Sequence, residues 1–335
     1  MFNGEHPFAQ YVRILGKGKT GSRNLTREES YQAMLMILKG EVEPVQLGAL
    51  MMLMRHQEES GEELAGFVDA AKEYIQIPDQ MPTIDFDWSS YAGKARRPPW
   101  FVLTALLLAE NNHTVLMHGS CAHTPGRVYS EQAFEYLGVP IASSLVEAAQ
   151  HIKESNFAYL PLKNFLPRLE EIMNLKPLLG LRSPVNTFTR LLNPCQSACS
   201  IQGIHHPGYK DCHQEASSLL KQPKMCVIKG DSGETEWNPD TNNLVRYVLN
   251  GEEVEEQWQA LFAKRHVNDK DMSLEKLKNV WSGKVEDEYA YGAVVGTSAI
   301  SLYTLGKAET HADALELARK YWLNRDKARF SQSRI

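Results

Sequence analysis

Three basic side chains lie where the sequence changes from a predicted strand to a predicted helix. Lys94, Arg96 and Arg97 close a segment that follows a strand expected at 83–86 and precedes a helix expected at 99–110. In an α/β fold such a junction lies at the carboxyl end of the sheet, where ligands bind and a helix N-terminus can hold an anion. These cations are long enough to bind phosphate by charge, so we predict a phosphate site here.

The same segment is poor in glycine for a phosphate-binding loop. Such loops normally contain several glycines, because backbone N–H groups must approach the anion and some residues take a positive φ. Only Gly93 is present, close to Tyr91, whose ring is a candidate for stacking on a nucleic-acid base. Trp88 and Trp100 are further aromatic candidates, for which core packing is the favoured interpretation. A solvated basic surface is the alternative for the cations.

Two further polar groups could line a pocket. His118 and Gly119 come directly after a predicted strand, and Arg127 follows nearby. Together they suit a polar pocket wall, although a histidine at a strand end is equally well explained as a hydrogen-bonded structural residue. Farther along the chain, Arg182 and Asn186 lie among apolar residues in a run that contains a second arginine and a second asparagine.

A third arrangement contains possible metal ligands. Three cysteines and three histidines lie within nineteen residues, namely Cys195, Cys199, His205, His206, Cys212 and His213. Four such side chains would satisfy tetrahedral zinc. Their spacing fits no paired Cys-x-x-Cys knuckle, so we favour buried thiols and loop histidines over a zinc site.

The overall composition is that of a globular protein without a basic excess. The 335 residues include 36 basic and 41 acidic side chains, a net charge of −5, which does not indicate nucleic acid as a partner. Charge is uneven, however. Eight acidic residues and one basic residue lie between Asp231 and Glu256, whereas Lys17, Lys19 and Arg23 lie close together near the N-terminus.

Targeting signals are not evident in the sequence. The first residues lack a secretory pattern, and the longest apolar stretch is too short to cross a bilayer. Five cysteines in a chain of this length do not indicate a disulfide scaffold. We therefore expect a soluble, cytoplasmic protein with no membrane partner.

The positions of helix and strand signals predict two domains. Capping boxes begin at Thr26 and Ser60, where a hydroxyl is followed three residues later by glutamate. From residue 83 onward, apolar β-type runs alternate with helical segments, which indicates a parallel sheet with crossover helices. We predict a small all-helical domain at 1–80 and a larger α/β domain at 81–335 with a mainly parallel central sheet.

Several motifs, in order along the chain, resemble the anthranilate phosphoribosyltransferase group of glycosyltransferase family 3. His118-Gly119 is similar to that family's Lys-His-Gly loop, and the segment 134–139 is similar to its Leu-Glu-Ala-Leu-Gly-Val segment. Gly180-Leu181-Arg182, followed by Asn186 and Asn193-Pro194, resembles its Gly-(Ile/Val)-Arg…Asn…Asn-Pro run.

The resemblance carries expectations for the fold and for an acceptor site. It implies a nucleoside phosphorylase/phosphoribosyltransferase-like fold in which helices from about 163–195 join the helical domain. It also implies acceptor-site roles for Arg182 and Asn186, because in the enzymes the corresponding arginine contacts anthranilate.

The departures from the family pattern lie in its phosphate and metal motifs. The family's Gly-Thr-Gly-Gly-Asp loop for phosphoribosyl pyrophosphate aligns with Trp-Ser-Ser-Tyr-Ala at 88–92. Met117 replaces the lysine before His-Gly, and Thr235 replaces the aspartate of the magnesium pair, which leaves Glu236 alone. One or two carboxylates usually hold Mg²⁺ together with substrate phosphates, so this change weakens the metal site without excluding it.

The substitutions resemble the divergent YbiB-type branch of the family, whose members are understood as dimeric, sequence-nonspecific nucleic-acid binders. The resemblance implies a DNA or RNA partner, a homodimer formed through the helical domain, and no certain cofactor. The predicted phosphate or nucleic-acid contacts are Lys94, Arg96, Arg97, Tyr91, Gly93, His118, Gly119, Arg127, Lys17, Lys19 and Arg23, with Arg182 extending the groove.

An active enzyme is the alternative. In that case the chain transfers ribose 5-phosphate from phosphoribosyl pyrophosphate to anthranilate or a related aromatic acceptor, Arg182 binds the acceptor, and Glu236 holds Mg²⁺. The missing glycine loop argues against this alternative, and the retained Arg182 argues for it.

Overall fold

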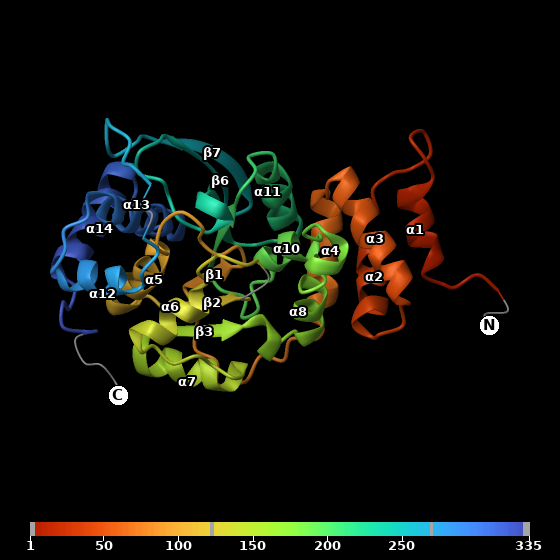
Figure 1. The fold of residues 1–335 in the computed structure, drawn as a ribbon, viewed down its shortest axis with the longest axis horizontal. Coiled ribbons are helices and arrows are strands. Elements are labelled where there is room, and N and C mark those ends of the chain that lie inside the picture. Colours follow the sequence, from red (N-terminus) through yellow and green to blue (C-terminus); the bar gives the residue numbers. More distant parts are fainter. Residues whose placement is uncertain (1–3, 121–123, 269–270, 331–335) are drawn as a thin grey trace.

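The computed structural model describes residues 4–120, 124–268 and 271–330, and its N-terminal part is helical (Figure 1). Four helices occupy this part: α1 (Ala9–Gly16), α2 (Arg27–Leu38), α3 (Pro44–Gln57) and α4 (Gly61–Lys72). Both predicted capping boxes are confirmed, because Thr26 and Ser60 accept the backbone N–H of Glu29 and Glu63, whose side chains return a hydrogen bond to the cap.

A segment from the middle of the chain packs on these helices. It consists of η1 (Leu162–Asn164), α8 (Pro167–Met173), α9 (Lys176–Leu179), α10 (Val185–Phe188) and η2 (Thr189–Leu191). Leu169, Ile172 and Phe188 from this segment share one buried apolar cluster with Phe67 and Met51 of the N-terminal helices. The burial of one continuous apolar surface is what holds segments so distant in sequence together.

The remainder of the chain is built on a seven-stranded sheet with the order β3-β2-β1-β4-β5-β6-β7. Its strands are β1 (Phe86–Ser90), β2 (Val115–Gly119), β3 (Phe157–Pro161), β4 (Cys199–Ile204), β5 (Lys224–Lys229), β6 (Asn243–Leu249) and β7 (Glu252–Trp258). The first five strands are parallel and the last two are antiparallel, so the predicted mainly parallel sheet is confirmed.

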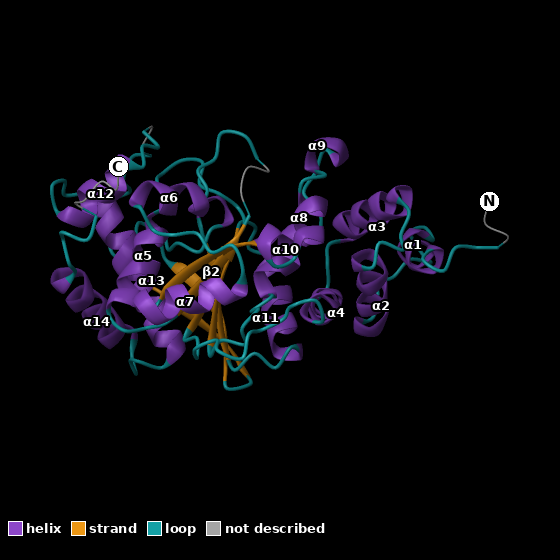
Figure 2. Ribbon diagram, turned by 90° about the horizontal axis from the view of Figure 1, so that it is seen from below, coloured by secondary structure: helices purple, strands orange, loops and turns teal. Residues whose placement is uncertain are grey.

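Helices cover both faces of the sheet (Figure 2). One face packs on α5 (Trp100–Glu110), α6 (Ser130–Leu137), α12 (Glu275–Ser282), α13 (Glu288–Leu305) and α14 (His311–Asn324). The other face packs on α7 (Leu145–Ser155) and α11 (Tyr209–Leu219). Trp88 and Trp100 are fully buried in the first of these cores, which confirms core packing as their role. No helix in the described ranges is long and apolar enough to cross a membrane.

The strands expected from the sequence differ from the structure at two places near the site. The strand expected at 83–86 begins at Phe86, so residues 88–90 belong to β1 and only the residues after Ser90 form the loop. Strand β4 was not predicted; it lies within the segment considered for zinc, and two of its six residues are serine and glutamine. Its central position, between β1 and β5, places the chain that follows it at the ligand-binding edge of the sheet.

Candidate functional site

In the loop after β1, residues 91–99, the chain itself neutralises one buried cation. Lys94 is fully buried, and its Nζ lies 2.6 Å from Glu236 Oε1 and 3.2 Å from Asp231 Oδ2. Burial alone would lower the pKa of Lys94, but the two carboxylates outweigh burial and raise it. Glu236 also accepts a hydrogen bond from the Phe101 N–H in the first turn of α5, at 2.9 Å. A carboxylate of the chain thus occupies the anion position at this helix N-terminus.

A second carboxylate occupies the backbone donors of the same loop. Glu234 Oε1 accepts hydrogen bonds from the N–H groups of Ala92 and Gly93, at 2.7 and 2.5 Å. Gly93 has φ +68°, and a Cβ there would meet the Tyr129 ring at 2.9 Å, so the position requires glycine. Arg127 donates to the carbonyl oxygens of Ala92, Gly93 and Ser232 and holds the loop from its other side.

The aromatic residue of this loop is buried against β2. The Tyr91 hydroxyl lies 2.5 Å from Nδ1 of His118, and Nε2 of His118 lies 3.0 Å from Oδ1 of Asp87 on β1. All three residues are fully buried. Gly119 follows in β2, where a Cβ would come within 2.1 Å of the Ser90 carbonyl oxygen. These contacts hold Tyr91 inside the protein.

The loop therefore corrects several predicted contacts. Tyr91 is fully buried and offers no stacking surface, and the Lys94 ammonium is engaged by two carboxylates. Arg97 is also buried, with its guanidinium 3.5 Å from the centre of the Tyr289 ring and hydrogen-bonded to the carbonyl of His266. Arg96 is exposed, so it is the one of the three predicted basic contacts in this loop that faces solvent.

The predicted basic residues near the N-terminus lie elsewhere. Lys17, Lys19 and Arg23 follow α1, on the outer side of the helical domain and away from the sheet (Figure 1). All three are exposed, and Arg23 makes two hydrogen bonds of 2.7 Å to Glu29. The structure does not bring them together with the loop after β1 within this chain.

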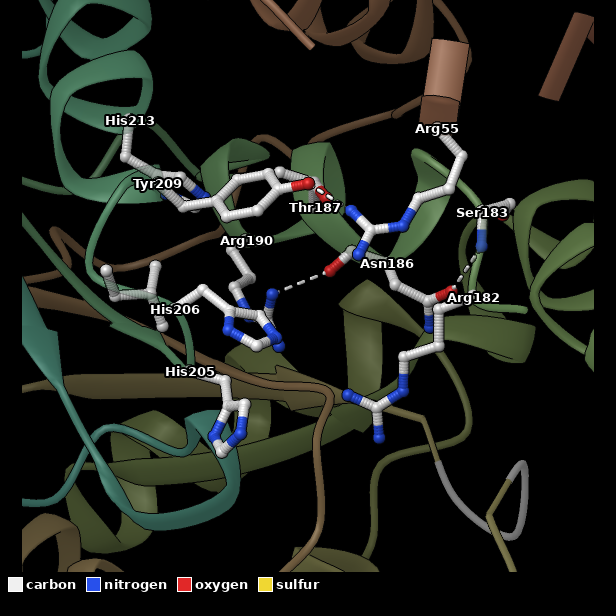
Figure 3. A pocket seen from close by; sticks show the side chains of 11 residues that line it. Arg55, Arg182, Ser183, Asn186, Thr187, Arg190, His205, His206, Tyr209 and His213 are labelled. Atoms are coloured by element: carbon white, nitrogen blue, oxygen red, sulfur yellow. Dashed lines mark hydrogen bonds between the residues drawn. The ribbon is translucent and has the colours of Figure 1, made fainter. Parts of the chain in front are cut away.

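A different group of cations lines a pocket between the helical domain and the sheet, which we call the junction pocket (Figure 3). Its lining comes from α3, from the segment 182–190 and from the start of the chain beyond β4, and consists of Arg55, Arg182, Ser183, Asn186, Thr187, Arg190, Ile204, His205, His206, Tyr209 and His213. The guanidinium groups of Arg55, Arg182 and Arg190 extend toward the same space (Figure 3).

The cations of the junction pocket lack carboxylate partners. Within the described part of the chain, no carboxylate lies at ion-pair distance from Arg55, Arg182 or Arg190. Arg55 donates a hydrogen bond to the Tyr209 hydroxyl, Arg182 to the Ala92 carbonyl and the Thr124 hydroxyl, and Arg190 to the Asn186 carbonyl. Burial and the neighbouring Arg182 lower the pKa of Arg190 to about 10. Burial, followed by Arg127, lowers the pKa of Arg182.

Two further cations extend this group toward the loop after β2. Lys176 of α9 donates to Thr124 at 2.9 Å, and its pKa is lowered by burial and by Arg182 and Arg127. Mutual repulsion among basic groups is the pattern expected of a site that binds an anion. We refer to Arg55, Arg127, Lys176, Arg182 and Arg190 together as the cationic cluster.

Sequence reasoning found part of this pocket. Arg182 and Asn186 were predicted as acceptor-site residues, and both line it. Arg55 was missed because it lies in the last turn of α3 and carries no local signal beyond being a cation at a helix C-terminus. Arg190 is the second arginine of the run that contains Arg182, and the sequence does not distinguish it from a surface residue. In the structure its side chain is buried, with 8% exposed.

Two of the side chains considered as metal ligands, His213 and Glu236, have other partners in the structure. In the described ranges, no three histidine, cysteine, aspartate or glutamate residues form a group that could hold a metal ion. His213 instead binds Gln202 through Nδ1 at 2.7 Å. Both oxygens of Glu236 are occupied, one by the Lys94 ammonium, so the residues present do not fit Mg²⁺, which requires free oxygen ligands.

Comparisons with known proteins agree with this fold along nearly the whole chain. The family model for the helical bundle domain of the glycosyl transferase family matches residues 9–74, and the model for its a/b domain matches residues 102–324. An anthranilate phosphoribosyltransferase from Dictyoglomus thermophilum is 24% identical over 93% of this chain and 94% of its own. The "Uncharacterized protein YbiB" of Escherichia coli is 26% identical over 69% of this chain and 73% of its own.

A solved structure shows the same fold. The anthranilate phosphoribosyltransferase of Saccharomyces cerevisiae, in complex with PRPP and Mg, superimposes with a TM-score of 0.77 over 98% of this chain and 97% of that chain. The sequences are 16% identical in this alignment, so the match establishes the architecture and no more.

Proposed function

This chain belongs to the anthranilate phosphoribosyltransferase-like glycosyl transferase family, and we propose that it uses the family scaffold to bind nucleic acid without sequence specificity. The proposed partner is DNA or RNA, and the working form is a homodimer joined through the helical domain. That domain and the helix packed on it expose large apolar side chains such as Val45 and Leu178, which suit a protein contact.

The observation that carries the proposal is a cationic cluster that has no carboxylate at ion-pair distance among the residues that the structure describes. Burying an arginine is costly unless an opposite charge or hydrogen bonds accompany it, and Arg190 has one carbonyl partner and cationic neighbours. Phosphate oxygens would supply the missing negative charge. Each phosphate bound also releases counterions from the nucleic acid, which makes such binding favourable at low salt.

The contacts of the loop after β1 favour nucleic-acid binding over the transfer of a phosphoribosyl group. The backbone N–H groups of Ala92 and Gly93 already donate to Glu234, and the Phe101 N–H in the first turn of α5 donates to Glu236. The Lys94 ammonium lies beside Glu236 and Asp231, where it provides the positive charge that a metal ion would otherwise provide. A pyrophosphate would have to displace these carboxylates before it could bind the same donors.

A second candidate function is an active phosphoribosyltransferase. The observation that favours it is that Arg182 and Asn186 share one pocket at the domain junction, as the family resemblance implies for an acceptor site. Relatives named anthranilate phosphoribosyltransferase also align with nearly the full chain. The reaction would move ribose 5-phosphate from phosphoribosyl pyrophosphate to anthranilate or a related aromatic acceptor.

Two assays on the intact protein separate these functions. Fluorescently labelled single- and double-stranded DNA is titrated at a series of salt concentrations, and anthranilate fluorescence is followed in parallel with phosphoribosyl pyrophosphate and Mg²⁺. We expect binding that weakens with salt, with a log–log slope of about −2 to −3 if three or so cations meet phosphates, and no loss of anthranilate. Consumption of anthranilate, or no DNA binding at low salt, would contradict the proposal.

A further inference from the structure

The floor of the junction pocket contains buried polar atoms without hydrogen-bond partners. Ser183 Oγ and Asn186 Nδ2 are both buried and unsatisfied, and each residue is 4% exposed. The Asn186 amide orientation is set by its other end, because Oδ1 accepts the Ser183 N–H at 3.2 Å. Nδ2 is therefore a donor, and the Ser183 hydroxyl can also donate. An unsatisfied buried donor costs about 1–3 kcal/mol, which an acceptor from a ligand would remove.

A buried cation lies beside these donors. Arg190 is 8% exposed, and one of its nitrogens donates to the Asn186 carbonyl at 2.8 Å. Burial lowers the pKa of both Arg190 and Arg182, and a cationic neighbour lowers it further, Arg182 for Arg190 and Arg127 for Arg182. Glu234 opposes this from outside ion-pair distance. His213 behind them contributes no positive charge, because burial and Arg190 lower its pKa to about 3. The floor therefore offers donors and charge to an acceptor group.

The size and shape of the pocket limit what that acceptor can be. Its volume is about 100 Å³. At roughly 10–15 Å³ for each water-sized atom, this space holds a compact group such as a phosphate. Arg190, Asn186 and Ser183 are buried at its floor, whereas His205 and His206 are exposed at its mouth. A phosphate bound to the three residues of the floor lies among buried side chains, which suits the end of a strand better than a phosphodiester with a sugar on each side.

We propose that the junction pocket binds the terminal phosphate of a nucleic-acid strand. This inference rests on the proposed function and names the part of the nucleic acid that this pocket recognises. A terminal phosphate carries about −1.5 to −2 charges at pH 7 and presents three oxygens, whereas an internal phosphodiester carries about one charge. Arg55, Arg182 and Arg190 match the higher charge, and Ser183 and Asn186 match the additional oxygens.

The test compares strand ends on otherwise identical DNA. A short single-stranded oligonucleotide carrying a fluorophore away from the tested end is prepared with a 5′-phosphate, with a 3′-phosphate and with hydroxyls at both ends. We expect one phosphorylated form to bind the intact protein about tenfold more tightly than the hydroxyl form, the effect of one or two charge-assisted hydrogen bonds. Equal affinity of all three oligonucleotides would overturn the inference.

Variants tie the preference to this pocket. Arg190→Met should abolish the preference for the phosphorylated end, and Arg182→Gln, at the half-buried edge, gives the same test if the first variant does not fold. The matched control is Arg319→Met, because Arg319 is exposed on α14, which lies at the end of the molecule farther from the helical domain (Figure 1). A preference that survives both pocket variants would also overturn the inference.

The outcomes separate this inference from the proposed function. Salt-dependent binding of the hydroxyl oligonucleotide without an end preference overturns the terminal-phosphate site and leaves nonspecific binding intact. Absence of binding by every oligonucleotide overturns both. Competition by inorganic phosphate and by a nucleoside monophosphate, measured against the phosphorylated oligonucleotide, distinguishes a strand end from a free phosphate. If free phosphate displaces the strand at concentrations equal to those of the strand, the strand end is not the preferred source and the inference fails.

Discussion

The loop after β1 and the junction pocket both contain buried cations, but their surroundings differ. Lys94 in the loop has Glu236 and Asp231 within ion-pair distance, whereas Arg190 in the pocket has a carbonyl and other cations as neighbours. The first arrangement is complete within the chain, and the second leaves positive charge for a ligand. The role of a basic residue here depends on which carboxylates the fold brings near it.

The acidic stretch between Asp231 and Glu256 also contains carboxylates with two different roles. Asp231, Glu234 and Glu236 turn inward and engage the loop after β1, while Glu252 and Glu253 are exposed on the edge strand β7. Exposed charges on an edge strand discourage pairing with another chain. The first part of this acidic stretch therefore neutralises buried groups, and the last part discourages the edge strand from pairing with another chain.

The largest expected effect concerns stability. Lys94→Met should lower the free energy of unfolding by about 3–5 kcal/mol, because it leaves buried carboxylates without their cation. Arg190→Met should change it by less than about 1 kcal/mol or raise it, because a buried charge without a partner is removed. Urea denaturation of both variants measures the difference. If both variants lose the same free energy of unfolding, the surroundings of Lys94 and Arg190 neutralise the two charges equally and the comparison fails.

A smaller effect is expected at the carboxylate that occupies the loop amides. Glu234→Ala should destabilise the fold by about 1.5–3 kcal/mol, because two backbone donors lose a charged acceptor. Added phosphate should restore part of this stability by binding the freed amides, which thermal unfolding at increasing phosphate concentrations would detect. Glu253→Ala on the exposed edge strand is the control. If phosphate stabilises this control and Glu234→Ala to the same extent, the amides are not an anion site.

Salt dependence gives a third test of the comparison. Arg182→Ala should reduce the slope of log affinity for DNA against log salt by about one, because one phosphate contact is lost. Arg97→Ala, which removes a buried cation stacked on Tyr289, should leave the slope unchanged. Arg96 is exposed, and we predict a reduction of up to about one for Arg96→Ala. A larger change for Arg97 than for Arg182 would reverse the roles that we assign to the two regions.

The last effect, which is absent at neutral pH, is a pH dependence in the junction pocket. The pKa of His213 is lowered from 6.5 to about 3, first by burial and then by Arg190. Between these values the unfolded chain binds a proton that the folded chain does not, so this contribution to stability is complete above pH 6.5 and decreases as the pH falls toward 3. His213→Gln should unfold less readily with acid over this range, as measured by urea midpoints at several pH values. Identical pH profiles for the variant and the parent protein would show that His213 is not the cause of the loss of stability in acid.

Much of the fold follows from local patterns in the sequence. Thr26 and Ser60 begin helices as predicted, since a capping box needs only residues three positions apart. The alternation of strands and helices after residue 83 indicated the parallel sheet, because parallel neighbours are joined by crossover connections that are usually helical. Strand β4 was missed, because a serine and a glutamine interrupt the apolar run that is expected of a central strand.

The roles of the charged residues depended on contacts between distant parts of the chain. Lys94 meets Glu236 across 142 positions, and Arg55 meets Tyr209 across 154. Residue types and spacing identified the cations and the glycine-poor loop, and only the family resemblance indicated the altered metal pair. Whether each cation is neutralised or available to an anion was decided only by the tertiary structure, because burial and the distance to a carboxylate set the free energy of a charge and neither is encoded locally.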